Sequence, residues 1–570
     1  MHLRSLSLAL LLLGAAAPTG HVSEPVQFTL APDLSRGALT GLQVQVRFRA
    51  DPSGTTNFGW AGGWAGERKL WQWARDLKVA GAMAVEKNGD DHWRIRSAPG
   101  EPLTVSYRVA SAYDHDPTVD DSDQPRPVIR PGWFYVVGSA LFGYPDDRED
   151  APATFDWLNA PGIGFASDLE HLAGRTREAT RAGTVADALE SIVIGGRELR
   201  TFPAQDGSGV RVATVGTYAF TPEELDSLAR RVIAVERAFW NSDRSAPFLV
   251  TAAPIVGSPT TMGFGGTGRG DAFALWVDQR TPLASMKWLL AHEYFHTWNP
   301  GYLGAMPQDR DARPAAYWFS EGFTDYYARA LMVRAGLISP AEFAAIWNEM
   351  LAAYAGSSVR TMPGVPAAAA FWNNEAAQKL PYQRGAMLAA IWNARLRAAS
   401  RGAVNLDTVL HAQIAAARSS REQATSLFQS LAGRNGLNTA ADVLRYVVKG
   451  EPILLPADTF GPCATITIEQ RPSFSRGFDA DATAKAGNVA TGVDSMLPAY
   501  AAGLRDGMKI LARTEGELDN ALVPYALSVE DKGQRRTIRY LPQGPERVAM
   551  QHVRITHAQS LECSRTLGGL

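Results

Sequence analysis

Residues 292–296 read His-Glu-Tyr-Phe-His, which places two imidazole rings one helical turn apart. Side chains four residues apart share one face of a helix, with about 5–6 Å between their Cβ atoms. At that spacing His292 and His296 can bind one metal ion, and Glu293 projects toward the place of a metal-bound water. The motif therefore predicts a zinc hydrolase with Glu293 as its general base. The alternative is a helix whose histidines face solvent or make hydrogen bonds in the core.

A third ligand is needed, because a catalytic zinc site has three protein ligands and one open position. The chain has two cysteines, and neither lies near residue 292. Glu321 in the run Ser-Glu-Gly-Phe-Thr-Asp is the best candidate for this ligand. Asp325 follows four residues later on the same helix face, where it can accept the free ring N–H of a ligating histidine. Taken alone, Glu321 is also typical of a first-turn glutamate favoured by the helix dipole.

Two helices are expected to carry these side chains. The first should begin at Thr281 and Pro282, an N-cap and first-turn pair, and should stop at the Asn-Pro-Gly run of residues 299–301. The second is expected over residues 318–335, with Ser320 as its N-cap.

The segments 292–299 and 318–327 together resemble the glycyl aminopeptidase family of zinc metallopeptidases. The resemblance implies a thermolysin-like catalytic domain, α/β at first and then helical, followed by a PDZ domain. It also implies one zinc ion per chain, held by the three candidate ligands, with Glu293 as the base. The segment Pro-Tyr-Gln-Arg-Gly-Ala at 381–386 is similar to one that supplies a transition-state tyrosine in related aminopeptidases. Tyr382 would then donate a hydrogen bond to the oxyanion, although it is also typical of a core tyrosine.

One segment departs from the family pattern. Family members usually carry a Gly-Gly-x-Glu-His type segment before the zinc helix, and related aminopeptidases bind the free amine of the substrate with its glutamate. Residues 263–271 are Gly-Phe-Gly-Gly-Thr-Gly-Arg-Gly-Asp, which has an arginine and no glutamate. Gly265 and Gly266 fit a backbone that passes close to a bound peptide. We expect residues 272–278 to form the edge strand for that peptide.

These features predict an exported zinc metallopeptidase that cleaves peptide bonds with a zinc-activated water. The resemblance favours an aminopeptidase that prefers N-terminal glycine or alanine. The missing glutamate leaves open a zinc endopeptidase acting on unfolded exported proteins, with the PDZ domain presenting their C-termini. A non-catalytic peptide-binding scaffold that retained zinc is a further alternative, although such a scaffold would not need Glu293.

The 570 residues are too many for one core and suggest several domains. Alternating apolar and polar positions predict a β-rich domain over residues 24–200, and helical patterns then predict the peptidase domain over 213–455. The stretch 462–570 returns to a β pattern, and residues 489–507 resemble the strand, short helix and turn of a PDZ domain. Its loop 476–478 could bind a C-terminal peptide.

The ends and the charge of the chain bear on where it acts. Residues 1–20 have a basic start, an apolar stretch and small residues, as in a signal peptide, so we expect export to a bacterial periplasm or the medium. No later run reaches the roughly 18 apolar residues that span a bilayer. A net charge of −2 without Lys/Arg blocks argues against nucleic acid or an anionic membrane as partner. In an oxidising compartment Cys463 and Cys563 are expected to form a disulfide; two free thiols are the alternative.

Overall fold

The computed structural model describes residues 24–60, 63, 67–118, 126–171, 183–205, 207–243, 245–257, 263–307, 309, 311–518, 520–556 and 561–570. The predicted signal peptide lies outside these residues. The described residues form two compact units, one within 1–115 and 125–197 and the other within 116–124 and 198–570. Within the described part of the chain, no helix is long and apolar enough to cross a membrane.

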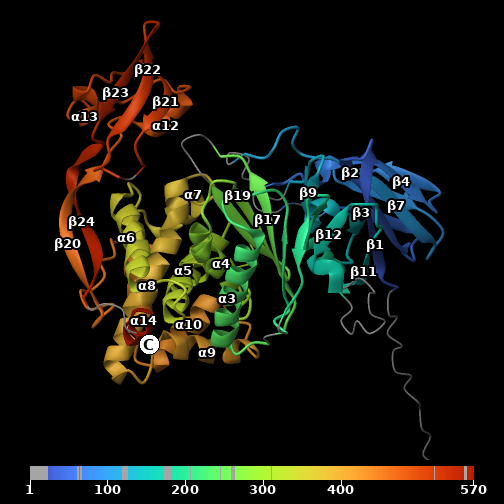
Figure 1. Cartoon of the computed structure of the whole chain (residues 1–570), viewed down its shortest axis with the longest axis horizontal. Helices are drawn as coiled ribbons and strands as arrows, with labels where there is room; N and C mark the ends of the chain where they lie inside the picture. The colour runs from blue at the N-terminus through green and yellow to red at the C-terminus, as the bar shows by residue number, and fades with distance from the viewer. Residues whose placement is uncertain are drawn as a thin grey trace, which may run out of the picture. The chain divides into compact units, whose positions relative to one another are not determined.

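The first unit is built from three β-sheets, which confirms the β-rich character predicted for the N-terminal region (Figure 1). The largest has the order β13 (Gly183–Thr184), β11 (Pro152–Trp157), β1 (Val26–Ser35), β2 (Ala38–Arg49), β7 (Pro102–Val109) and β4 (Ala74–Ala80). The second has the order β10 (Tyr144–Pro145), β3 (Thr55–Gly59), β6 (His92–Arg96) and β5 (Ala84–Lys87). The third has the order β12 (Gly164–Ser167), β14 (Ile192–Gly196), β9 (Trp133–Val137) and β8 (Val128–Ile129). Buried and exposed residues alternate along β2 and β7, because successive side chains of a strand point to opposite faces.

The second unit begins with a five-stranded sheet. Its order is β15 (Arg200–Phe202), β16 (Val210–Thr214), β17 (Phe248–Ile255), β19 (Ala272–Asp278) and β18 (Phe264–Arg269). The expectation that residues 272–278 form the edge strand is therefore wrong. Every residue of β19 is buried, as suits an inner strand that is covered on both faces. The edge is the glycine-rich strand β18, which pairs antiparallel with β19 and has few side chains to bury.

Helices follow the sheet, and their starts differ in detail from the predictions. Helix α3 (Pro222–Trp240) opens with a capping box made by Thr221 and Glu224. Helix α4 (Met286–Phe295) starts later than expected, after the 3-10 turn η4 (Leu283–Ser285). Helix α5 (Tyr317–Arg334) follows the 3-10 turn η5 (Arg313–Ala316), so Ser320 lies inside the helix and is not its N-cap. The other helices of this layer are α6 (Pro340–Gly356), α7 (Gly364–Ala370), α8 (Glu375–Ser400), α9 (Leu406–Ala417), α10 (Ala424–Arg434) and α11 (Thr439–Asp442), followed by the π-helical turn η6 (Val443–Val448).

Helices α5 and α8 cross at two glycines. A Cβ atom on Gly322 would lie 2.3 Å from the Cα atom of Gly385, and one on Gly385 would lie 1.9 Å from the carbonyl oxygen of Trp318. Any larger residue at either position would push the helices apart. The crossing therefore sets how closely the residues of α8 approach Glu321, which directly precedes Gly322.

The C-terminal stretch contributes to two hydrophobic cores. The long ribbon of β20 (Ala464–Phe474) and β24 (Gln543–Ile555) starts in the large hydrophobic core of the second unit, which includes Ala464 and Val553. A smaller core is formed around the sheet of β21 (Lys509–Glu515), β22 (Tyr525–Asp531) and β23 (Gln534–Tyr540), with helices α12 (Ala480–Lys485) and α13 (Pro498–Ala501). The predicted domain 462–570 therefore contains a ribbon anchored in the large core of the second unit and a small β domain.

Cys463 and Cys563 are joined by a disulfide, with their Cα atoms 5.4 Å apart. Cys463 directly precedes β20, and Cys563 lies in the last helix, α14 (Leu561–Leu567). Both cysteines and Leu567 belong to the large core of the second unit. The disulfide therefore ties the start of the ribbon to a helix that packs with that core.

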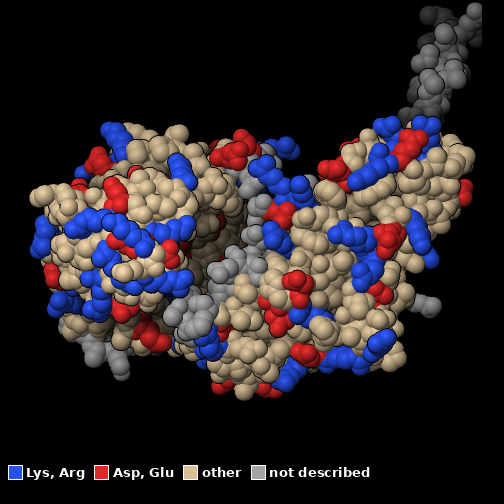
Figure 2. Space-filling view, turned by 90° about the horizontal axis from the view of Figure 1, so that it is seen from above, with Lys and Arg blue, Asp and Glu red and all other residues tan. Residues whose placement is uncertain are grey.

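Charged side chains of both signs are interspersed over the face shown in Figure 2. This agrees with the near balance of 56 basic and 58 acidic residues in the chain. On that face the acidic groups interrupt the basic ones, so they do not build a large single-sign field of the kind that attracts polyanions.

Replacing both cysteines by alanine should lower the free energy of unfolding of the second unit by up to about 4.7 kcal/mol, the chain-entropy value for a loop of about 100 residues. The loss of stability should appear in the ribbon and in α14, because the disulfide joins these two elements within the large core. Hydrogen exchange should show faster exchange in β20 and α14 and unchanged exchange in β22. Equal loss of protection in β22 would contradict this assignment. If both thiols can be alkylated in the unreduced protein, the two cysteines do not form a disulfide.

Candidate metal centre

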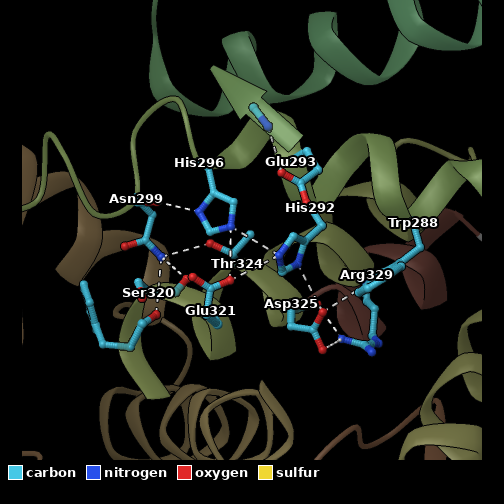
Figure 3. Close-up of polar contacts among 12 residues, drawn as sticks. Trp288, His292, Glu293, His296, Asn299, Ser320, Glu321, Thr324, Asp325 and Arg329 are labelled. Atoms are coloured by element: carbon cyan, nitrogen blue, oxygen red, sulfur yellow. Dashed lines mark hydrogen bonds and ion pairs between the residues drawn. The ribbon is translucent and has the colours of Figure 1, made fainter. Parts of the chain in front are cut away.

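Helices α4 and α5 bring the three predicted ligands together (Figure 3). The Nε2 atoms of His292 and His296 lie 3.2 Å apart. Oε2 of Glu321 lies 3.4 Å from Nε2 of His292 and 3.2 Å from Nε2 of His296. Among the described residues, this is the one group of three or more His, Cys, Asp or Glu side chains with the spacing of a metal site.

The triangle of donor atoms fits zinc. Zinc–nitrogen and zinc–oxygen bonds are about 2.0–2.1 Å long, and two such bonds at a tetrahedral angle hold their donor atoms about 3.3–3.4 Å apart. The observed separations of 3.2–3.4 Å match that value. The side chain of His292 is 4% exposed, whereas that of His296 is 23% exposed, so one side of the triangle is open. Three ligands with an open side are typical of a catalytic zinc site.

The free ring nitrogen of each histidine has a partner that orients the ring. Nδ1 of His292 donates to Oδ1 of Asp325 at 3.2 Å, as the sequence predicts. Nδ1 of His296 donates to the carbonyl oxygen of Asn299 at 2.8 Å. Both bonds leave Nε2 free to bind the metal, which is the usual arrangement of metal-binding histidines.

Asn299 also joins the two helices. Its side-chain Nδ2 donates to the carbonyl oxygen of Ser320 at 2.9 Å and to Oγ1 of Thr324 at 3.1 Å. The residue is fully buried. The sequence indicated only that Asn299 is part of a helix stop. Its contacts with Ser320 and Thr324 could not be predicted, because they join segments that are distant in the chain.

The charges around the triangle favour a cation within it. Burial opposes the charged form of His292, but hydrogen bonds with Asp325 and Glu321 outweigh it and raise the pKa of His292 to about 10. Burial also opposes the charged form of Glu321, yet His296 and His292 hold the pKa of Glu321 well below its usual range. The carboxylates therefore supply the negative charge that a divalent ion needs in a buried site.

Glu293 does not belong to the triangle. Its Oε2 accepts a hydrogen bond from the backbone N–H of Gly268 in β18 at 3.2 Å, so the carboxylate lies between the ligands and the edge strand (Figure 3). Burial raises the pKa of Glu293, and the charge of Glu321 adds to this, whereas His292 and His296 act against it. A carboxyl group whose pKa is raised toward the working pH is suited to accept and return a proton.

Tyr382 lies over the ring of His292, with ring centroids 5.8 Å apart and an angle of 20° between the planes. Burial, followed by the charges of Glu321 and Glu293, raises the pKa of Tyr382 well above its usual value, so the hydroxyl keeps its proton. The structure thus places a neutral O–H donor beside the triangle of ligands.

The glycines of β18 differ in what surrounds them. A Cβ atom on Gly265 would meet nothing within 4 Å, so this position is open to a bound peptide. A Cβ atom on Gly266 would lie 2.4 Å from the ring of Phe273, so glycine is required there by packing against β19. Arg269, the arginine of this segment, is 4% exposed and is part of the interior.

Two further residues contact the carboxylate of Asp325, and neither was among the predicted site residues. Nη1 of Arg329 lies 2.7 Å from Oδ2 of Asp325, and Nε1 of Trp288 donates to Oδ1 of Asp325 at 3.1 Å (Figure 3). Because Arg329 is close to it, the pKa of Asp325 stays below its usual value although burial acts in the opposite direction. The spacing of Asp325 and Arg329, four residues on one helix, is a signal that could have indicated this pair.

Residues 285–386 match the family model described as M61 glycyl aminopeptidase. By structure, the chain is similar to an aminopeptidase N family protein from Idiomarina loihiensis, with a TM-score of 0.69 and 14% sequence identity over 95% of this chain and 99% of that chain. It is also similar to an M1 zinc metallopeptidase from Deinococcus radiodurans, with a TM-score of 0.47 and 16% identity over 76% of this chain and 96% of that chain. A search of curated protein sequences found no match.

The matched segment contains the three candidate ligands together with Glu293 and Tyr382, and the geometry of the ligands fits one zinc ion. The chain is therefore an enzyme, a zinc metallopeptidase, and its residues 285–386 match the M61 glycyl aminopeptidase model.

Proposed function

We propose that the protein is an exported aminopeptidase that removes N-terminal glycine or alanine from peptides. The observation that carries the proposal is the grouping of a zinc-sized ligand triangle with Glu293 and Tyr382 beside the edge strand β18. The match to the glycyl aminopeptidase model supports the preference for a small first residue. Export is supported by the signal-like composition of residues 1–20.

Each side chain has a distinct task in this mechanism. Zinc, held by His292, His296 and Glu321, would supply the acidity that lowers the pKa of water from 15.7 toward about 7. Glu293 takes the proton from the attacking water and delivers it to the leaving amine. The hydroxyl of Tyr382 donates a hydrogen bond to the oxygen that becomes negatively charged.

The edge strand β18 offers a place for an extended substrate to bind. β18 pairs with β19 on one side, and its other side ends the sheet, so an extended peptide can add to it through backbone hydrogen bonds. Gly265 leaves space for the peptide at this edge. Since Gly268 contacts Glu293, a peptide paired with β18 lies alongside the base.

A second candidate is a zinc endopeptidase of exported proteins. The observation in its favour is the absence of a glutamate from the described segment 263–271, where related aminopeptidases bind the free amine. Arg269 does not replace it, because its side chain is buried. A scaffold that only holds zinc is less well supported, since Glu293 is present and lies beside the ligands.

The small β domain would act on peptides rather than on the chemical step. Its PDZ-like sequence supports binding of the C-terminal peptide of a substrate at the loop 476–478. In this loop Gly477 has φ of +76°, and its carbonyl oxygen accepts a hydrogen bond from the backbone N–H of Asp494. The expected partners are therefore peptides and unfolded proteins.

The metal and the base can be separated by mutation. The protein should bind about one zinc ion and lose hydrolysis in a chelator, since water is activated only when the metal is bound. His292→Ala and Glu321→Ala should lose zinc, whereas Glu293→Gln should keep zinc and lose nearly all turnover. Metal analysis and peptide hydrolysis measure the two effects. Full zinc occupancy in both ligand variants would refute the ligand assignment, and a normal rate for Glu293→Gln would refute the mechanism.

Substrate preference distinguishes the two candidate functions. We expect kcat/KM to be highest for Gly and Ala before the cut, and to fall on the order of 10–200-fold for larger apolar residues, the usual range for size discrimination in a pocket. Free and N-acetylated forms of the same peptides provide the comparison. A loss of most activity on acetylation supports the aminopeptidase, although the requirement should be weaker than is usual in the family. Equal rates for both forms would favour the endopeptidase.

Removal of the Tyr382 hydroxyl tests its place in the mechanism. Tyr382→Phe should lower kcat by about 10²–10³, the usual effect of losing one donor to an oxyanion, and should leave zinc content unchanged. Tyr302→Phe is a suitable control, because Tyr302 lies in the same unit and is 63% exposed. A normal kcat in Tyr382→Phe would show that Tyr382 only packs against His292.

A further inference from the structure

Arg329 lies behind the metal centre, one helical turn after Asp325 on α5, and it is 5% exposed. Its Nη1 atom lies 2.7 Å from Oδ2 of Asp325 and donates to the backbone carbonyl oxygen of Asp325, also at 2.7 Å. A buried guanidinium that bonds a carboxylate is a strong, charge-assisted contact. Arg329 does not touch the ligand triangle itself, so any effect on the metal must pass through Asp325.

Two tryptophan rings lie near this guanidinium. The Cζ atom of Arg329 lies 5.9 Å from the ring centroid of Trp288 and 5.6 Å from that of Trp347. Trp288 belongs to α4 and Trp347 to α6, so three helices fix the position of one charge. Attraction between a cation and an aromatic ring is strongest when both are removed from water, and Trp347 is fully buried.

The arrangement leaves Asp325 little freedom to turn. Its Oδ1 accepts hydrogen bonds from Nδ1 of His292 and from Nε1 of Trp288, and its Oδ2 is bound by Arg329. With Arg329 in place, Oδ1 faces His292. Without it, Oδ2 has no partner, and the carboxylate can rotate away from the imidazole. His292 would then lose the acceptor that aims its Nε2 atom at the metal.

We propose that Arg329, which contacts the rings of Trp288 and Trp347, is a positioning residue that sets the zinc affinity of the site through Asp325 and His292. The inference rests on the proposed function only in that the triangle binds zinc. The proposal also assigns a role to α6, which contacts Arg329 through Trp347 although this helix provides no metal ligand.

A second arginine on the same helix provides a matched control. Arg334 also lies on α5, has a side chain that is 10% exposed, and pairs with a carboxylate, Asp407, at 2.7 Å. Neither Arg334 nor Asp407 contacts a ligand of the triangle or Asp325 in the bonds described for them. Loss of Arg334 removes a buried ion pair of similar kind without touching the metal centre.

The test measures zinc dissociation constants by competition with a chromogenic chelator, for the wild type and for Arg329→Met, Arg329→Lys and Arg334→Met. Partners behind metal ligands typically change affinity by about 10–100-fold, so we expect a loss of this size in Arg329→Met. Arg329→Lys keeps the charge but not the planar guanidinium near the two rings, and it should recover part of the affinity. It also keeps the test decisive if Arg329→Met does not fold. Arg334→Met should lower the melting temperature and leave the dissociation constant within about twofold of the wild type.

Coupling to Asp325 is measured in the same assay. Asp325→Asn should weaken zinc binding, and adding Arg329→Met to it should change the affinity little further, because both act through one contact. Normal zinc affinity in Arg329→Met and Arg329→Lys, equal weakening by Arg334→Met, or full additivity with Asp325→Asn would each overturn the proposal. A wild-type protein that binds no zinc would instead refute the proposed function, on which the inference rests.

Discussion

The metal centre depends on one physical requirement, that charged side chains buried among apolar helices be paired with each other. An isolated buried charge is costly, and a paired, hydrogen-bonded one is tolerated. Three such buried side chains are His292, Glu321 and Asp325, and each has a partner of opposite charge or polarity. The same pairings that make burial tolerable also fix the directions of the ligand atoms. Stability and metal geometry are thus satisfied by one set of contacts, and Arg329 extends that set beyond the ligands.

The approach of α8 to α5 is a second constraint. Gly322 and Gly385 allow the two backbones to meet, and Tyr382 lies one turn before Gly385 on α8. Because Gly322 directly follows Glu321, the point of closest approach lies next to a ligand, and the ring of Tyr382 lies 5.8 Å from that of His292. The glycine after the ligand glutamate therefore has a packing reason, separate from any need for an unusual backbone angle.

The sequence predicted that the candidate ligands lie together, because their grouping depends on spacing within a helix and on side-chain type. His292 and His296 follow from a four-residue spacing, and Glu321 and Asp325 follow from a second helix with the same periodicity. The errors concern tertiary contacts. Residues 272–278 are as apolar as an inner strand should be, but which strand lies at an edge depends on pairing that no local pattern reveals. The contact between Arg329 and Trp347 was missed for the same reason, since it joins two different helices.

The two cores of the C-terminal stretch suggest how its tasks are divided. Cys463, Ile466 and Val553, at the base of the ribbon, share a core with the helices that carry the metal ligands. Tyr525, Leu527 and Ile538 form the centre of a separate core in the small β domain. A change in the first core alters packing around α5 and α6, and can therefore reach the ligands. A change in the second affects a core that contains none of these helices. If the small domain contributes to activity, its effect should fall on how peptides reach the site, since the residues that would perform the chemical step are all held by the larger core.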